Sequence, residues 1–165
     1  MSGKRSLVVQ FLGLLGFLAL TAAAAGIGSW ATIPNIDSWY AQVRKPSWTP
    51  PNWVFGPAWT TLYLLMSVAA WRVWRRVDAD PEARKNALGC WLFQLLLNAA
   101  WSWLFFGMHD TGLAFVELIS MWLVILATLV AFVRIDRVAA VLMAPYLLWV
   151  TYAGSLNGAI FWLNR

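Results

Sequence analysis

Four side chains with the chemistry to bind a ligand lie inside segments that are otherwise apolar: Trp59, Asn98, Glu117 and Trp149. An indole ring offers a face on which aromatic molecules stack, and an amide both donates and accepts hydrogen bonds. An ionisable residue inside an apolar run is a functional candidate by default. Because small-molecule sites are mostly apolar with a few convergent polar groups, this combination predicts a ligand pocket.

The same sequence lacks the machinery of conventional enzymes. Glu117 forms no acid–base pair, and its alternative role is to reach the membrane interface or to accept a hydrogen bond from a neighbouring helix. His109, the single histidine, lies in the short segment 107–112, where it either ligates haem iron or is solvated. Cys90 is the single cysteine, which excludes an internal disulfide. No phosphate-binding glycine loop, zinc-ligand spacing or catalytic triad occurs, so we expect no catalytic residue and no metal site.

The composition is that of a membrane protein. Of the 165 residues, 61% are hydrophobic and 12% are charged, whereas soluble domains hold about 45–50% apolar and about 25% charged residues. The net charge of +5 invites a nucleic-acid partner. However, the charges flank apolar runs and therefore indicate membrane topology. We expect the lipid bilayer, and no nucleic acid, as a partner.

Five apolar runs of about 20 residues are each long enough to cross the hydrocarbon core as a helix. The sequence therefore predicts an all-α integral membrane protein, with a five-transmembrane-helix bundle and a long Trp/Pro-rich loop between helices 1 and 2. We expect one domain, residues 1–165. The predicted helices span about residues 7–28, 54–76, 81–107, 112–133 and 137–162. The first run also resembles a secretory signal, because basic residues precede it and alanines follow its apolar core.

Capping residues support these helix boundaries. Pro57 suits the first turn of the second helix. Asp80 is a predicted N-cap of the third helix, and Thr111 and Asp136 are predicted caps of the fourth and fifth. Pro145 predicts a kink in the fifth helix, which neighbouring helices can accommodate.

Lysine and arginine are divided unequally between the two sides of this topology. Nine lie on one side and three on the other, and the side richer in these residues is usually cytoplasmic. We therefore expect a multi-pass protein, in the bacterial cell membrane, with a cytoplasmic N-terminus and an external C-terminus. The nine are Lys4, Arg5, Arg72, Arg75, Arg76, Arg84, Lys85, Arg134 and Arg137, and the three are Arg44, Lys45 and Arg165.

Residues 29–53 form the longest predicted non-helical connection, and its aromatic part runs into the start of the second helix over residues 39–59, WYAQVRKPSWTPPNWVFGPAW. Their aromatic content argues against disorder, and their prolines reduce the entropy lost on ordering. At about 1.5 Å per residue, the four candidate side chains lie about 6–12 Å below this loop. The loop is therefore a predicted cover over a pocket. The alternatives are interfacial tryptophan belts, and interhelical hydrogen bonding by Gln94 and Asn98.

The sequence resembles the translocator protein / tryptophan-rich sensory protein family (TspO/MBR, the peripheral benzodiazepine receptor family). The matching segments are WY at 39–40, KPSWTPP at 45–51, WVFGPAWTTLYLLM at 53–66, LLLNAAW at 95–101, FFG at 105–107, APYLLW at 144–149 and LN at 156–157. The resemblance implies five retained transmembrane helices and a homodimer. Gly158 stands where the cholesterol motif of animal members has a tyrosine, so sterol recognition through that motif is not expected.

The resemblance also implies a membrane receptor or transporter-like protein, with a role in tetrapyrrole regulation or stress response. Its ligands would be porphyrins (protoporphyrin IX or haem) and hydrophobic drug-like molecules, with no cofactor required. The implied ligand-binding residues, together with Glu117, are Trp39, Tyr40, Phe55, Trp59, Asn98, Trp101, Tyr146, Trp149, Ala153 and Leu156. Trp59 and Trp149 match tryptophans linked in some members to light-dependent porphyrin breakdown. The alternative function is therefore a light- and oxygen-dependent porphyrin-degrading enzyme, and a third is a regulatory partner whose pocket merely holds lipid.

Overall fold

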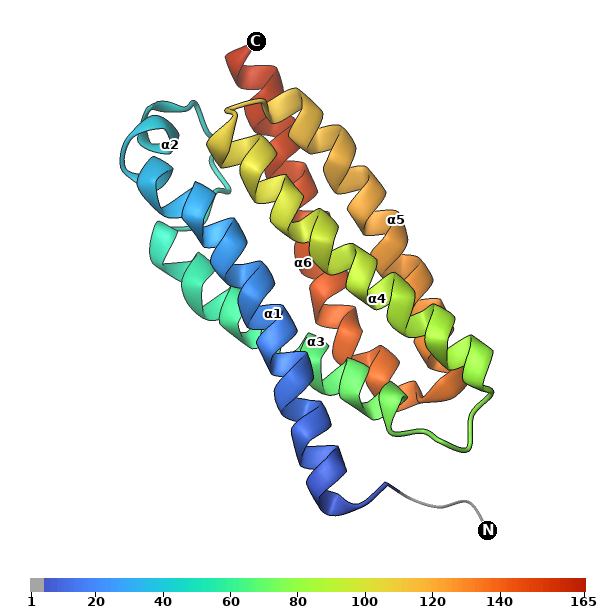
Figure 1. Ribbon diagram of the computed structural model, residues 1–165. Coiled ribbons are helices and arrows are strands. Elements are labelled where there is room, and N and C mark those ends of the chain that lie inside the picture. The colour runs from blue at the N-terminus through green and yellow to red at the C-terminus, as the bar shows by residue number, and fades with distance from the viewer. Residues whose placement is uncertain (1–4) are drawn as a thin grey trace.

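The computed structural model, which describes residues 5–165, is a bundle of five long helices with one irregular connection at an end (Figure 1). All five are long and apolar enough to cross a membrane, and the chain is an integral multi-pass membrane protein. The long helices are α1 (Leu7–Ile36), α3 (Phe55–Trp74), α4 (Pro81–Ser102), α5 (Thr111–Ile135) and α6 (Arg137–Asn164), and the short elements are α2 (Trp39–Gln42), the 3-10 turn η1 (Asn52–Val54) and the π-helical turn η2 (Trp103–Gly107).

The helix starts follow ordinary capping chemistry. The Asp80 carboxylate accepts a hydrogen bond from the Ala83 amide, and Pro81 occupies the first turn of α4. Asp136 caps α6 in the same way, as predicted. The predicted cap Thr111 is wrong by one residue, because the carboxylate of Asp110 accepts the hydrogen bond from the Leu113 amide.

The first helix is longer than the sequence pattern predicted. It continues for eight residues past position 28, to Ile36, and it contains Pro34. The side chains of Thr32 and Asn35 donate hydrogen bonds to backbone carbonyls one turn earlier. The connection that was predicted to begin at residue 29 is therefore shorter, and begins after Ile36.

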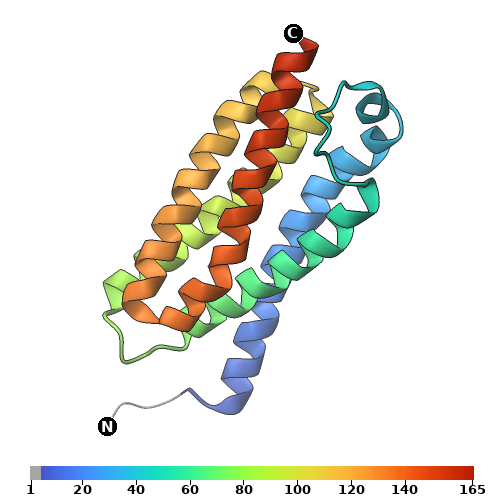
Figure 2. The same cartoon turned by 180° about the vertical axis from the view of Figure 1, so that it is seen from behind.

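The five long helices close into a ring. Helix α1 packs against α3 and α4, α3 packs against α6, and α5 packs against both α4 and α6. Met66, Trp91 and Tyr146 are fully buried between them. The ring places α5 away from α1 and α3, with α2 at one end of the bundle next to the end of α1 (Figures 1 and 2).

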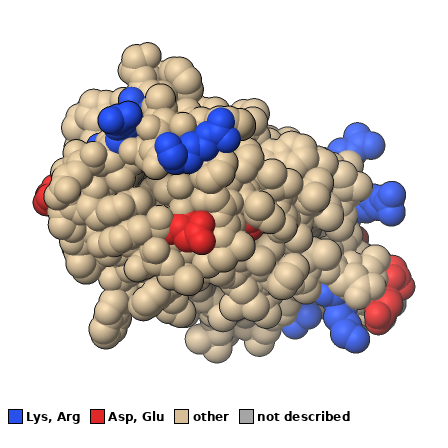
Figure 3. Space-filling model, turned by 90° about the horizontal axis from the view of Figure 1, so that it is seen from above, with Lys and Arg blue, Asp and Glu red and all other residues tan. Residues whose placement is uncertain are grey.

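The face of the bundle that is seen from above Figure 1 is largely uncharged, with most charged side chains near its edges (Figure 3). Large apolar side chains such as Phe11, Leu123 and Leu148 are exposed on the long helices, as expected for helices that face lipid. The charged loop between α3 and α4 lies at the end opposite α2 (Figure 1). Lys4, which belongs to the predicted cytoplasmic group, lies outside the described residues.

Candidate functional site

A cavity of about 520 Å³ lies between α1, α3, α4 and α6 at the α2 end of the bundle. This volume falls within the roughly 300–1,000 Å³ of small-molecule sites. Its walls contain eight of the eleven residues that the sequence singled out. These eight are Tyr40, Phe55, Trp59, Asn98, Trp101, Trp149, Ala153 and Leu156.

Two indole rings form the aromatic wall of the cavity. Trp59 on α3 and Trp149 on α6 meet edge to face, with ring centroids 6.4 Å apart and an interplanar angle of 81°. Phe55 meets Trp149 in a similar edge contact at 6.0 Å. Edge-to-face pairs stabilise one another through the ring quadrupoles, so this wall is held in one arrangement.

Beside the aromatic wall, a chain of hydrogen bonds crosses from α3 through α4 to α6. The Tyr63 hydroxyl donates to the Asn98 carbonyl oxygen, and the Asn98 amide donates to the Tyr146 hydroxyl at 3.2 Å. The Tyr146 hydroxyl in turn donates to the Met121 sulfur at 3.6 Å. Asn98 therefore forms interhelical hydrogen bonds, which was the alternative to a pocket role in the sequence analysis. It also lines the cavity.

The segment between α1 and α3, residues 37–54, covers the end of the cavity, and we call it the lid. Helix α6 fastens it at two points. The Asn164 amide pairs with both the backbone N–H and the carbonyl of Arg44, at 3.0 and 2.9 Å. The Tyr152 hydroxyl donates to the carbonyl of Trp48 at 2.8 Å. Figure 2 shows the lid beside the C-terminal end of α6.

A third fastening joins the lid to the connection between α4 and α5. The Trp39 and His109 rings stack with centroids 4.3 Å apart and an angle of 9°. The Nε2 atom of His109 lies 3.0 Å from the side-chain oxygen of Asn35. His109 is exposed and does not line the cavity, so this geometry does not favour haem ligation.

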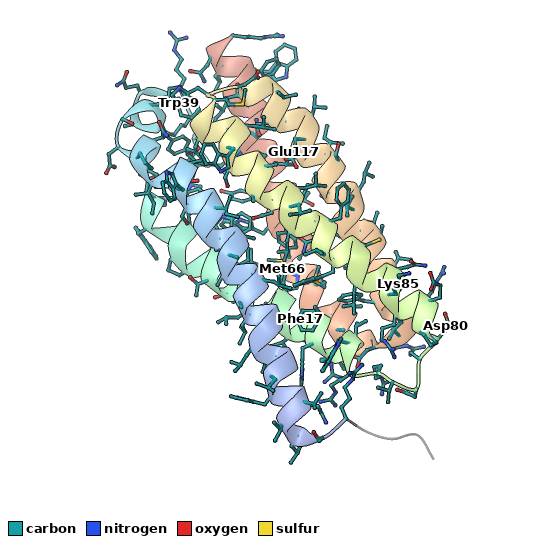
Figure 4. All side chains as sticks on the ribbon, in the orientation of Figure 1. Phe17, Trp39, Met66, Asp80, Lys85 and Glu117 are labelled. Carbon is teal, nitrogen blue, oxygen red and sulfur yellow. The ribbon has the colours of Figure 1, made fainter. Side chains whose placement is uncertain are left out.

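Three residues singled out by the sequence do not line the cavity. Trp39 packs on its outer side against Phe105 and His109. Tyr146 is fully buried behind Trp59, with ring centroids 6.1 Å apart. Glu117 lies on α5, which contributes no cavity wall, and neither of its carboxylate oxygens accepts a hydrogen bond within the described chain. Figure 4 shows Trp39 in the lid and Glu117 well separated from it on α5.

The sequence prediction missed the wall that α1 provides. Six residues of this helix line the cavity, four of them beyond the predicted end of the helix, and none of them is chemically conspicuous. They are Ala25, Gly28, Ser29, Thr32, Ile33 and Ile36. Tyr63 and Asn157 were also missed, although each carries a sequence signal: Tyr63 follows Trp59 by one helical turn, and Asn157 directly follows Leu156.

Comparison with known proteins identifies the family. Residues 17–163 match the TspO/MBR family. The chain is 41% identical to the tryptophan-rich sensory protein of Cereibacter sphaeroides, over 90% of each chain. It is 37% identical to protein CrtK of Rhodobacter capsulatus, over 93% of this chain and 95% of the relative, and 36% identical to the human translocator protein, over 89% and 87%. The cavity, the lid and the five spans thus belong to a member of the TspO/MBR family.

Proposed function

We propose that this protein is a membrane receptor or transporter-like protein whose cavity binds a flat tetrapyrrole such as protoporphyrin IX. The observation that carries the proposal is the aromatic wall that Trp59 and Trp149 form in the cavity. A planar aromatic molecule has two large apolar faces and gains stabilisation by stacking on or packing against indole rings. The cavity is mostly apolar, with the Asn98 amide on one side, which is the usual form of a small-molecule site.

The test is a titration of the purified protein in phosphatidylcholine nanodiscs with protoporphyrin IX, following quenching of tryptophan fluorescence. We expect saturable quenching in the wild type. The Trp149→Ala variant should bind about tenfold more weakly or worse, because a large aromatic contact is lost. The matched control is Trp162→Ala on the same helix, whose indole is exposed and lies outside the cavity. Absence of saturable quenching in the wild type, or equal affinity in the two variants, would contradict the proposal.

Selectivity separates this function from passive lipid storage. A pocket that merely holds lipid would bind porphyrins and other flat apolar molecules of similar size equally well. We expect protoporphyrin IX to compete with drug-like isoquinolines for one site, and to be preferred over a flat polycyclic hydrocarbon. Equal affinities would favour the passive role.

A second candidate function is light- and oxygen-dependent porphyrin breakdown. The contact between Trp59 and Trp149 favours it, because both indoles lie on the cavity where an excited porphyrin would be held. For this reaction the cavity contains the oxidisable side chains of Trp59 and Trp149. The carboxylate of Glu117 does not line the cavity and is not positioned to act there as an acid or base.

We also propose the orientation and assembly that the sequence predicted. The described members of the basic group, including Arg72, Lys85 and Arg137, lie at or near the helix ends opposite the lid. Under the positive-inside rule this distribution supports an orientation with the lid outside the cell. Labelling of Ser47→Cys, but not Asp78→Cys, by an impermeant maleimide in intact cells of a Cys90→Ala background tests this orientation. Chemical cross-linking in the membrane tests the proposed homodimer.

A further inference from the structure

The lid end of the cavity carries one cation that is positioned differently from its neighbours. Arg44, Lys45 and Arg165 are the lysine and arginine residues at this end. The backbone of Arg44 is held by Asn164 while the residue itself is exposed. The guanidinium of Arg165 lies over the Trp162 ring, at the end of α6. Among the described residues, neither guanidinium group has a contact with a residue that lines the cavity.

The Lys45 ammonium lies against a residue of the cavity wall. Its nitrogen stands 4.5 Å from the centroid of the Tyr40 ring, and Tyr40 lines the cavity. An ammonium has three N–H donors. One of them is used by the Val43 carbonyl at 3.2 Å, and within residues 5–165 no carboxylate lies within ion-pair distance of Lys45. Lys45 does not itself line the cavity, but two donors and a full positive charge therefore remain next to Tyr40, which does.

Two further polar groups lie at the same end. The Tyr40 residue is 6% exposed, and its hydroxyl takes part in none of the hydrogen bonds among the described residues. Burial raises the pKa of Tyr40, and the neighbouring Tyr152 phenol adds to the effect, so the hydroxyl keeps its proton at neutral pH and remains a donor. Asn52, in η1 of the lid, also lines the cavity. The other two asparagines that line the cavity, Asn98 and Asn157, already bond other side chains.

We infer that Lys45, with Tyr40, forms an anion subsite at the lid end of the cavity, and that it selects planar ligands carrying a carboxylate on one edge. The inference rests on the proposed function and adds to it the residues that recognise the acidic edge of such a ligand. The ligand is oriented by this subsite: its acidic edge faces the lid, and its apolar body faces Trp59 and Trp149. A charge-assisted hydrogen bond from an ammonium to a carboxylate is stronger than a neutral one, so it provides the selectivity.

The experiment compares protoporphyrin IX with its dimethyl ester, which has the same ring and no acidic edge. Both are titrated against the protein in phosphatidylcholine nanodiscs. We expect the wild type to bind the free acid about tenfold more tightly than the ester. In Lys45→Gln the ratio of the two affinities should fall to near one, whereas Lys45→Arg should keep the preference. The matched control is Arg44→Gln, which removes the adjacent charge and should keep the wild-type ratio.

Salt provides a measurement that needs no variant. The free-acid affinity of the wild type should fall as ionic strength rises, while the ester affinity should not. If Lys45→Gln binds neither compound, the Lys45→Arg variant and the salt dependence decide the question. A wild-type ratio near one, or an unchanged ratio in Lys45→Gln, overturns the inference and leaves the proposed function standing. Failure of both compounds to bind the wild type overturns the proposed function, and this inference with it.

Discussion

Arg72 on α3 and Asp136 at the junction of α5 and α6 form a two-pronged ion pair. The guanidinium donates to both carboxylate oxygens of Asp136, at 3.0–3.2 Å, and Arg76 approaches the same carboxylate at 3.6 Å. The Asp136 side chain is 3% exposed and also caps α6 through the Ala139 amide. One carboxylate thus joins three helices at the end opposite the lid.

Removing this charge should destabilise the bundle. In Asp136→Asn the side chain can still cap α6, but the ion pair is lost and two guanidinium groups remain against a neutral amide. We expect a loss of about 1–3 kcal/mol in the free energy of unfolding, because Arg72 is partly exposed and the pair is therefore partly screened. Unfolding in detergent measures it. The control is Glu82→Gln, whose pair with Lys85 is exposed, and a loss as large as that of Asp136→Asn would contradict this account.

The same pair predicts a dependence of stability on pH. Burial alone would raise the pKa of Asp136, but the hydrogen bonds from Ala139 and Arg72 and the charges of Arg72 and Arg76 outweigh it and hold the pKa below its ordinary value of 3.8. Because the folded-state pKa is the lower one, the stabilisation is complete above about pH 4 and is lost as the pH falls through the folded-state value. The difference in melting temperature between wild type and Asp136→Asn should therefore shrink in acid. A constant difference across this range would rule the linkage out.

Substitution of two amides on one face of α4 should change the free energy of unfolding by different amounts. Asn98 bonds two tyrosine hydroxyls, so Asn98→Leu should reduce the free energy of unfolding by about 1–3 kcal/mol. Gln94 donates only to the Met66 sulfur at 3.8 Å, and its buried oxygen has no partner. Gln94→Leu should therefore be neutral or stabilising. Each variant is the control for the other, and equal losses in unfolding experiments would contradict the assignment.

Releasing the lid should shorten the residence time of the ligand. Asn164→Ala removes both hydrogen bonds to the Arg44 backbone, each of which contributes about 1 kcal/mol. We expect protoporphyrin IX to dissociate about fivefold faster or more, measured by stopped-flow fluorescence. Hydrogen exchange should show faster exchange of the lid amides even without ligand. Ser155→Ala, on the same helix, is the control, because its hydroxyl bonds only the Tyr152 carbonyl within α6.

If the second candidate function is correct, Trp59 and Trp149, two of the indoles that line the cavity, should control the photochemistry. Replacing Trp59 and Trp149 together by phenylalanine keeps an apolar wall but removes the more easily oxidised rings. Under illumination in air, the porphyrin absorbance of the bound complex should decay several-fold more slowly in the double variant than in the wild type. Trp162→Phe should decay as the wild type does, and samples in the dark or without oxygen should be stable. Equal decay in the double variant and the wild type would exclude this function.

The sequence was sufficient to predict the five spans, because lipid leaves a long apolar run little choice but a helix. It was insufficient at the end of α1. Residues 29–36 are polar enough, with Pro34, to be typical of a loop, but the side chains of Thr32 and Asn35 bond back to the backbone and α1 packs against η2. Those contacts depend on tertiary structure, which local sequence does not contain.

The sequence predicted at which end of the bundle the candidate site lies, but not which helices and side chains face it. Glu117 lies at the expected level, yet it belongs to α5, and the order of helices around the ring keeps α5 off the cavity. Trp39 and Tyr40 are neighbours in α2, where successive side chains point about 100° apart, so only Tyr40 faces inward. Which helix adjoins which, and how a short helix is rotated, are set by packing between segments far apart in the chain.

Helix α6 has a double role whose consequence is mechanical. It contributes Trp149 and Ala153 to the wall of the cavity, and it holds the lid through hydrogen bonds from Tyr152 and Asn164. A tilt or translation of α6 would therefore change the width of the cavity and the position of the lid together. A ligand that displaces Trp149 would therefore also act on the lid through α6, without contacting the lid itself.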